Sequence, residues 1–161
     1  MSAAGLLNKL VSRDEALSQI AGLPRPVVFT NGVFDVLHRG HVTYLEQARA
    51  LGGSLVVALN TDASARRLGK GADRPLNNER DRAVVMAALE SVSLVTWFDD
   101  DTPLELISTL KPDVLVKGGD YRPDTVVGAE VVRARGGRVE IVALLPHHST
   151  STLVERLRAP S

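Results

Sequence analysis

Five short apolar runs alternate with amphipathic segments along the chain. The runs cover residues 26–32, 54–60, 93–98, 113–119 and 138–145. Nearly continuous apolar character over so few residues is typical of strands that are covered on both faces. The segments between and after these runs have helical patterns, over residues 40–51, about 62–68, 78–91, 102–110, about 124–135 and roughly 150–158. The alternation predicts an α/β fold with a parallel five-stranded sheet and helices on both faces.

Capping signals support several of these helices. Ser12 with Glu15, Thr102 with Glu105, and Thr152 with Glu155 each fit a capping box, in which the first side chain and the fourth satisfy backbone N–H groups reciprocally. Pro103 fits the first helical position of the second of these helices. We expect residues 1–22 to form an N-terminal helical extension, and residues 23–161 to form the main domain.

Each predicted strand ends in a polar cluster. In chain order the clusters are TNGVFD, NTD, FDDD, KGGDY and PHHSTST, and the first and last of them contain all four histidines. The carboxyl ends of parallel strands meet along one edge of the sheet, where open α/β folds bind their ligands. Polar loops are common after strands, but five such clusters in succession favour a binding site at this edge.

Composition narrows the classes of function. The 161 residues suggest one domain, and 19 basic and 19 acidic residues give no net charge that would attract nucleic acid. No apolar run is long enough to span a membrane, and the N-terminus is too charged for a signal peptide. The chain has no cysteine, which excludes a disulfide or thiolate-based metal site. We expect a cytoplasmic protein without nucleic-acid or membrane partners.

The stretch TNGVFDVLHRGH, residues 30–41, carries the most specific chemistry. His38 and His41 lie about one helical turn apart, beside Gly40, where a helix is expected to begin. The N–H groups and dipole of that helix would favour an anion, and two imidazoles could stabilise charge on a phosphate. Two alternatives are a packed pair that caps the turn and a metal pair. The metal pair lacks both the H-E-x-x-H pattern and a cysteine ligand.

The pattern T-x-G-x-F-D-x-x-H-x-G-H resembles the signature of the nucleotidyltransferase superfamily that includes the cytidylyltransferases and the pantetheine-phosphate adenylyltransferases. Further segments resemble the adenylyltransferase domain of the enzymes that make ADP-heptose. These segments are TYLEQARALG, VALNTDAS, RRLGKG, RPLNNERDR, ALESV, LVKGGDY and GG-x-V. The likeness covers roughly residues 24–158, and the length leaves no room for the sugar kinase to which that domain is often fused. We therefore expect a stand-alone domain with a Rossmann-like fold of the nucleotidyltransferase type.

The resemblance implies transfer of AMP from ATP to D-glycero-β-D-manno-heptose 1-phosphate, which gives pyrophosphate and ADP-heptose for lipopolysaccharide. A sugar phosphate is already an anionic nucleophile, so the reaction requires no general base, and the sequence shows no Ser/His/Asp or Cys/His arrangement. A cytidylyltransferase acting on glycerol 3-phosphate or a similar alcohol phosphate is the alternative. The resemblance also implies a homodimer, and Mg²⁺ that arrives with ATP without a dedicated protein cage.

The resemblance also assigns roles to individual residues. Catalysis is expected from His38, His41 and Lys70. ATP binding is expected from Thr30, Asn31, Gly32, Phe34, Gly40, His41, Arg82, Lys117, Gly118, Ser149, Thr150 and Ser151. Substrate binding is expected from Asp35, Asn60, Asp62, Gly119 and Asp120.

Some of these residues have a second interpretation. Lys117 could face either a ligand or Asp120. Of the two nearby arginines, we expect Arg82 to contact phosphates and Arg80 to be a surface charge. We expect Asp35 chiefly to fix its loop by accepting backbone hydrogen bonds, with assistance to Mg²⁺ as the alternative. Ser149-Thr150-Ser151 departs from the Ser-Thr-Thr of the superfamily but keeps the hydroxyl groups. His147 and His148 lie outside the expected pattern.

Overall fold

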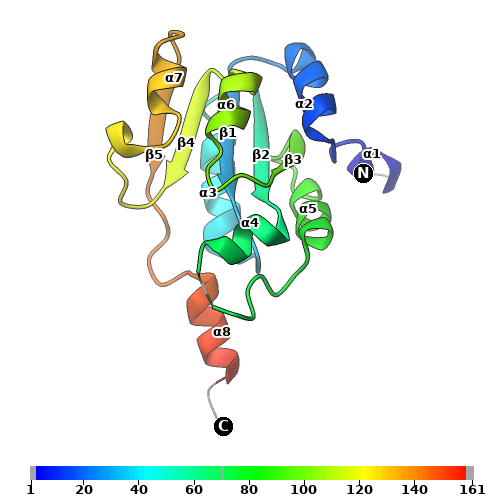
Figure 1. Ribbon diagram of the computed structural model, residues 1–161, viewed down its shortest axis with the longest axis vertical. Helices are drawn as coiled ribbons and strands as arrows, with labels where there is room; N and C mark the ends of the chain where they lie inside the picture. The colour runs from blue at the N-terminus through cyan, green and yellow to red at the C-terminus, as the bar shows by residue number, and fades with distance from the viewer. Residues whose placement is uncertain (1–2, 70, 159–161) are drawn as a thin grey trace.

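The structure is a computed structural model that describes residues 3–69 and 71–158. Its strands are β1 (Val27–Gly32), β2 (Ser54–Asn60), β3 (Leu94–Phe98), β4 (Val114–Gly118) and β5 (Arg138–Val142). They form one parallel sheet in the order β3-β2-β1-β4-β5, which confirms the predicted fold (Figure 1). The fifth strand ends at Val142 rather than at the predicted residue 145.

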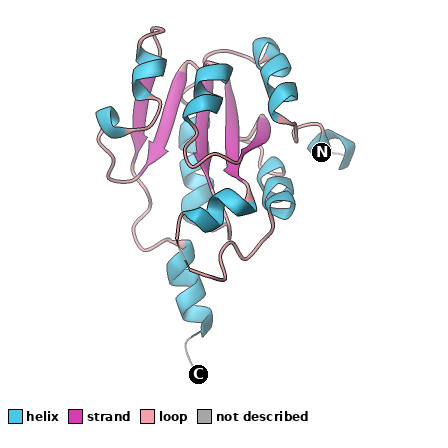
Figure 2. Ribbon diagram, viewed as in Figure 1, coloured by secondary structure: helices cyan, strands magenta, loops and turns pink. Residues whose placement is uncertain are grey.

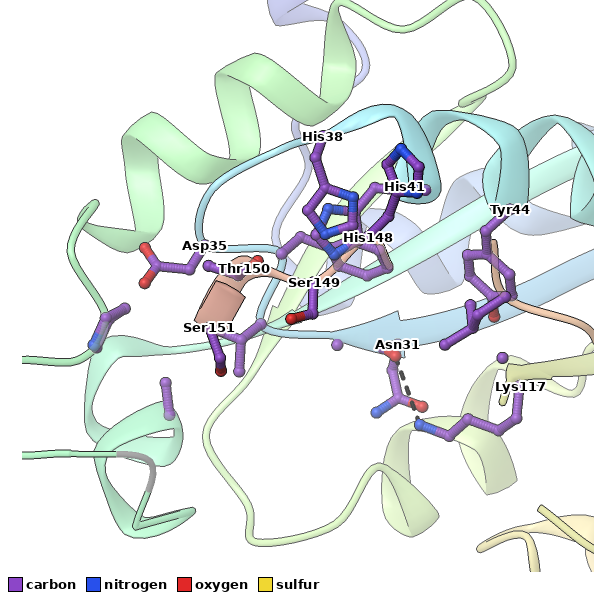
Figure 3. Close-up of a pocket in the computed structure, with 18 of the residues that line it drawn as sticks. Asn31, Asp35, His38, His41, Tyr44, Lys117, His148, Ser149, Thr150 and Ser151 are labelled. Atoms are coloured by element: carbon purple, nitrogen blue, oxygen red, sulfur yellow. Dashed lines mark hydrogen bonds between the residues drawn. The ribbon is translucent and has the colours of Figure 1, made fainter. Parts of the chain in front are cut away.

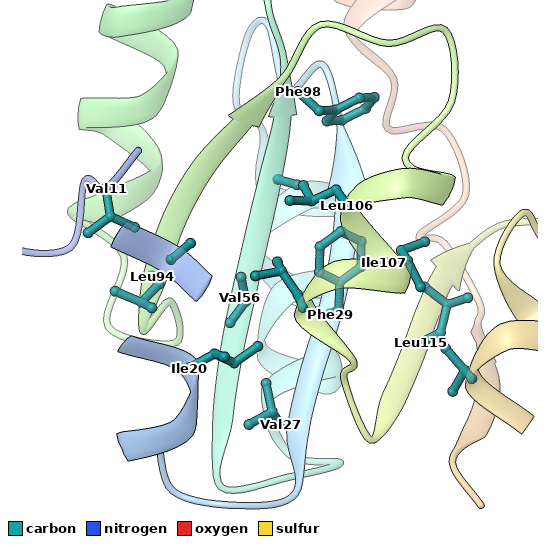
Figure 4. Close-up of a cluster of buried hydrophobic side chains, with 14 of the residues drawn as sticks. Val11, Ile20, Val27, Phe29, Val56, Leu94, Phe98, Leu106, Ile107 and Leu115 are labelled. Carbon is teal, nitrogen blue, oxygen red and sulfur yellow. The ribbon is translucent and has the colours of Figure 1, made fainter. Parts of the chain in front are cut away.

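Helices flank the sheet on both faces (Figure 2). In chain order they are α1 (Ala3–Leu7), α2 (Arg13–Gln19), η1 (Ile20–Gly22), α3 (Arg39–Arg49), α4 (Asp62–Arg67), α5 (Glu79–Ala87), α6 (Leu104–Leu110), η2 (Pro123–Thr125), α7 (Ala129–Arg133) and α8 (Thr150–Arg158). Successive residues of β1 point to opposite faces, so Val27 and Phe29 pack with α2, α6 and α7, while Val28 packs with α3 and α5. Figure 4 shows the first of these two apolar layers. Both faces of the sheet are therefore buried, which explains the continuous apolar runs.

Two predicted helices differ most from the structure. The helix predicted over 78–91 ends at Ala87, where the chain continues in tighter turns. The helix predicted over 124–135 is divided into η2 and α7 by Gly128, which has a φ of +89°. A Cβ atom on Gly128 would lie 2.7 Å from Ile107 Cδ1, so both the backbone angle and the packing require glycine here.

The three predicted capping boxes have different outcomes. Ser12 Oγ accepts from the Glu15 N–H, and Glu15 Oε2 accepts from the Ser12 N–H at 2.7 Å, which confirms the first. The second is wrong, because α6 begins only at Leu104 and Pro103 occupies the cap position without a side-chain hydrogen bond. The third is also wrong, because α8 begins two residues earlier than Thr152. The Ser149 hydroxyl instead accepts from the Thr152 N–H at 3.1 Å.

The N-terminal segment packs against the main domain. Val11 N–H donates to Val95 O and Val95 N–H donates to Lys9 O, so this segment adds a short bridge at the β3 edge. Val11, Ala16 and Ile20 are buried in the core. The segment is helical as expected, and its treatment as a separate unit stays a prediction. No helix in the described ranges is long and apolar enough to cross a membrane.

The strand order has a reversal that positions the site. The chain runs outward from β1 through β2 to β3, and then crosses to β4 on the other side of β1. The loops after β1 and β4 therefore diverge from neighbouring strands, and open α/β sheets bind ligands in the crevice formed there.

Candidate active site

A cavity of about 370 Å³ lies at this reversal, between the carboxyl ends of β1 and β4 and the start of α8 (Figure 3). Many of the residues predicted from the sequence line it, namely Asn31, Gly32, Phe34, Asp35, His38, Gly40, His41, Lys117, Gly118, Ser149, Thr150 and Ser151. Their elements are far apart in the sequence, and the sheet topology brings them together.

The two histidines of the H-x-G-H motif are stacked neighbours. The ring centroids of His38 and His41 lie 3.9 Å apart, with 25° between the ring planes. His38 is the N-cap residue of α3, and His41 lies in its first turn. A Cβ atom on Gly40 would lie 2.9 Å from His38 Nδ1, so glycine lets the ring pack against the helix start. The helix start and the two rings therefore face the same space.

The surroundings of His38 lower the pKa of its imidazole. Burial of the ring, and secondly electrostatic repulsion from His148, lower the pKa of His38 below 6.5. A neutral imidazole still has one N–H with which to donate a hydrogen bond. At neutral pH His38 can therefore serve as a donor to an oxyanion without carrying a charge of its own.

A second helix start faces the cavity from the other side. Thr150 Oγ1 donates to Val36 O at 3.1 Å, which ties the first turn of α8 to the loop before α3. The first N–H groups of a helix have no partner within it, and the dipole makes that end positive. Two helix starts that meet at one cavity, together with the hydroxyl of Ser149, favour an extended anion such as a polyphosphate.

Lys117 adds a cation at the carboxyl end of β4. Its Nζ atom donates to Asn31 O at 3.5 Å, as the dashed line in Figure 3 shows. Of the two interpretations of Lys117, this position favours a ligand, because Lys117 lines the cavity and Asp120 does not. The ammonium group lies on the side of the cavity opposite the histidines, where it could balance a second part of a bound anion.

Asp35 fixes the loop that precedes α5. Its carboxylate accepts from the N–H groups of Leu76 and Asn77 at 2.8 and 2.9 Å, and from Arg74 Nε at 2.8 Å. Burial would raise the pKa of Asp35, but these donors outweigh it and lower the pKa below the ordinary value. The predicted role in fixing the loop is confirmed. The side chain is only 2% exposed, and its contact with the substrate stays a prediction.

Arg82 lies beneath the site and does not line the cavity. Its buried guanidinium donates to the carbonyl oxygens of Val33, Asn60 and Asn77, and to the carboxylate of Asp62 at 2.8 Å. These bonds hold the loop after β1 against β2 and α5. Contact between Arg82 and the phosphates stays a prediction, and the structure instead gives the side chain a role in positioning the loop.

Other predicted site residues also lie away from the cavity. Thr30 is buried with its hydroxyl 2.6 Å from the Tyr44 hydroxyl, and burial raises the pKa of Tyr44 to about 12. Asn60, Asp62, Gly119 and Asp120 do not line the cavity. Lys70 lies outside the described residues.

The polar clusters after β2 and β3 bind each other. Thr61 Oγ1 donates to Asp99, and Ser64 Oγ donates to Asp100 O at 2.9 Å. Arg67 pairs with Asp101 at 2.7 Å and also contacts the Asp99 carbonyl. These contacts give the two clusters a structural role. The cavity is lined mainly by the segments after β1, β4 and β5, with Ala65, Arg74 and Pro75 added from the region between β2 and α5.

Several residues that line the cavity were not predicted from the sequence, namely Val33, Tyr44, Ala65, Arg74, Pro75, Tyr121, Leu144 and His148. Tyr44 lies one turn after His41, so helical spacing could have indicated it. His148 precedes Ser149 directly, which was a usable signal. Arg74 lies in a loop without regular structure, and its sequence position gives no indication of the contact with Asp35. In the described part of the chain, no group of three or more histidine or carboxylate side chains is placed to hold a metal ion.

Similarity to known proteins agrees with this arrangement. A family model described as cytidylyltransferase-like matches residues 29–155. A Bordetella bronchiseptica protein named D-beta-D-heptose 1-phosphate adenylyltransferase is 54% identical over 160 residues, which cover 98% of this chain and 99% of that protein. The bifunctional protein HldE of Magnetococcus marinus is 61% identical over 155 residues, 94% of this chain. The chain spans 32% of that protein's length, so it corresponds to one part of HldE.

Solved structures show the same fold. The lipopolysaccharide core biosynthesis protein from Thermoplasma volcanium is 30% identical, with a TM-score of 0.60, and the match covers 76% of this chain and 98% of that one. Pantoate-beta-alanine ligase from Francisella tularensis has a TM-score of 0.58 at 12% identity, over 88% of this chain and 68% of that one, which is a likeness of fold alone. The family model and the near-complete match to a heptose 1-phosphate adenylyltransferase establish that this chain belongs to the cytidylyltransferase-like family.

Proposed function

We propose that this protein joins AMP from ATP to D-glycero-β-D-manno-heptose 1-phosphate, releasing pyrophosphate and forming ADP-heptose for lipopolysaccharide synthesis. The near-complete match to a protein named for this activity supports the choice of substrate. The observation that carries the reaction type is the cavity, in which two stacked imidazoles and two helix starts converge. Such a site favours binding of a polyphosphate, and it can stabilise the negative charge that increases on the phosphate oxygens in the transition state.

The reaction follows from this chemistry in one displacement. An oxygen of the sugar phosphate attacks the α-phosphorus of ATP, the new O–P bond forms, and the bond from the α-phosphorus to the bridging oxygen breaks. The electron pair leaves with pyrophosphate, and no proton has to be removed from the nucleophile. The protein must align two anions that repel each other and neutralise charge on the phosphoryl oxygens.

His38 and His41 suit the α-phosphate, because they lie at the start of α3 and are held together by Gly40. Each can donate a hydrogen bond to an oxygen whose charge increases in the transition state. The start of α8, with Ser149 and Thr150, suits the β- and γ-phosphates, and Lys117 suits the acceptor or the far end of the nucleotide. Mg²⁺ would enter with ATP as part of the substrate and retain much of its water.

We also propose that the reaction takes place in the cytoplasm and that the protein is a homodimer. Light scattering at the concentration used for assays would measure its mass. A monomer at that concentration would contradict the dimer without affecting the proposed reaction.

The decisive experiment measures pyrophosphate release with two nucleotides and two acceptors. ATP with heptose 1-phosphate should give turnover, and CTP with glycerol 3-phosphate should give little. Turnover restricted to CTP and glycerol 3-phosphate would instead support the cytidylyltransferase alternative, which the family description leaves open. If ATP binds but no acceptor releases pyrophosphate, the protein is a nucleotide-binding module, and the proposed function is wrong.

A further inference from the structure

A third imidazole faces the same cavity as the H-x-G-H pair. The ring centroid of His148 lies 6.3 Å from that of His38, and His148 lines the cavity from the segment before α8 (Figure 3). The resemblance to the family gives no role to this residue. Its ring is exposed at the cavity mouth, so a ligand could reach it.

The surrounding contacts fix the position of His148. A Cβ atom on Gly40 would lie 3.0 Å from His148 Cβ, so the segment carrying His148 packs directly against the start of α3. The bond from Thr150 to Val36 O ties the same segment to the loop that carries His38. The position of His148 is therefore determined by the same contacts that form the site.

The orientation of the ring can be assigned from its hydrogen bond. His148 Nδ1 lies 2.7 Å from Pro146 O. A carbonyl oxygen can only accept, so Nδ1 carries the proton and donates. Nε2 is then the ring atom left for a ligand. It can donate to a phosphate oxygen when the imidazole is positively charged, and a bound polyphosphate would favour that charged form.

We propose that His148 is a binding residue for the leaving pyrophosphate portion of the nucleotide, which it contacts through Nε2 as an imidazolium. This inference rests on the part of the proposed function that concerns ATP binding. It gives the three imidazoles different tasks, since the stacked pair would serve the α-phosphate and His148 would serve the β- or γ-phosphate. The start of α8 would thus offer the nucleotide a positively charged ring in addition to its hydroxyl groups.

Two substitutions of His148 test the contributions of Nδ1 and Nε2 separately. His148→Asn places an amide N–H where Nδ1 is, which keeps the bond to Pro146 O and removes the Nε2 donor. His148→Gln places its amide farther out, near the position of Nε2, and gives up the bond to Pro146 O. His147→Asn is the matched control, because His147 is the adjacent residue, does not line the cavity, and has a φ of +63° that asparagine tolerates.

Isothermal titration calorimetry with Mg-ATP and with Mg-pyrophosphate, without acceptor, gives the affinities. His148→Asn should weaken both by about 5- to 10-fold, the scale of a charged hydrogen bond at an exposed site. His148→Gln should lie between His148→Asn and the wild type, and His147→Asn should equal the wild type. Unchanged affinity in His148→Asn would overturn the inference. So would a weaker affinity in His148→Gln than in His148→Asn, because the contact with Pro146 would then be the important one.

The pH dependence of binding gives a second readout. Because the proposed contact requires the charged ring, wild-type affinity should be higher at about pH 6 than at about pH 8, and His148→Asn should show a smaller difference. The other ionisable groups facing the cavity stay in place in that variant, namely His38, His41, Tyr44, Lys117, Tyr121 and the Asp35–Arg74 pair. An identical pH dependence in both proteins would overturn the inference. Because no acceptor is present, these outcomes are independent of whether pyrophosphate is released with heptose 1-phosphate.

Discussion

The two walls of the cavity are held in different ways. The wall formed by the end of β1 and the start of α3 is held by buried contacts. Arg82 donates hydrogen bonds to three backbone carbonyl groups, and Asp35 accepts hydrogen bonds from two backbone N–H groups. The wall formed by residues 146–151 is largely exposed, and it is tied to the first wall through Thr150. One wall is part of the folded core, and the other is added at its edge.

This difference suggests a division of labour. A donor that acts on the transition state must be held in position before the reaction, which a buried network can achieve. A donor that binds the leaving group must also let it go, which an exposed wall permits. We therefore expect changes in the first wall to affect stability and kcat, and changes in the second to affect the KM for ATP.

The largest effect should come from removing the buried charge beneath the first wall. Arg82→Met should lower the free energy of unfolding by about 3–5 kcal/mol, because it leaves several carbonyl groups and the Asp62 carboxylate without their donor. Urea unfolding measures this loss. Arg80→Met is the control, since Arg80 is exposed on the same helix. Equal stability of the two variants would mean that the first wall does not depend on this network.

The next effect concerns the donors themselves. His38→Ala and His41→Ala should each lower kcat by about 10²- to 10³-fold, the loss expected for a transition-state donor. Pyrophosphate release under saturating ATP and heptose 1-phosphate measures it, and thermal unfolding checks that the variants fold. Normal turnover in both would remove the basis for the proposed mechanism. A rise in KM with unchanged kcat would assign these residues to the binding task expected of the second wall.

The fold could be predicted from the sequence because each strand is buried on both faces and therefore has a continuous apolar run. Phe29, Val56 and Leu115 belong to such runs and lie in the core. The strand order could not be derived, since it depends on which long connections cross β1. Helix ends were predicted less accurately than strands, because Gly128 interrupts a periodic pattern that would otherwise continue as one helix.

The candidate site shows the same limit for side chains. His38 and His41 could be placed because local helical spacing fixes their relation. Arg82 was expected beside the phosphates because it resembles the family arginine that contacts them. Its burial depends on Val33 and Asn60, which come from distant segments and cannot be identified from local sequence.

A pH-dependent effect should follow from Asp35. The pKa of its carboxyl is below the ordinary value of 3.8 in the folded state, so the group stabilises the fold above that pH and loses the contribution as pH falls through its lower, folded value. Asp35→Asn should cost about 2–3 kcal/mol at neutral pH, because its amide cannot accept all three bonds. Urea unfolding at about pH 7 and about pH 3 measures both. The difference between wild type and variant should shrink at the lower pH, and a constant difference would contradict the assignment.

The smallest effect should come from the second wall, at Ser149. Ser149→Ala should cost about 1 kcal/mol of stability, because the hydroxyl caps α8 through the Thr152 N–H, and should raise the KM for ATP a few-fold with little change in kcat. Ser149→Asn and Ser149→Asp separate the two roles, since both side chains cap a helix well and only the second repels a polyphosphate. Both should restore stability, and only Ser149→Asp should raise the KM above that of Ser149→Ala. Equal KM values for the asparagine and aspartate variants would show that the start of α8 supports the fold without facing the nucleotide. Only the first wall would then contact ATP.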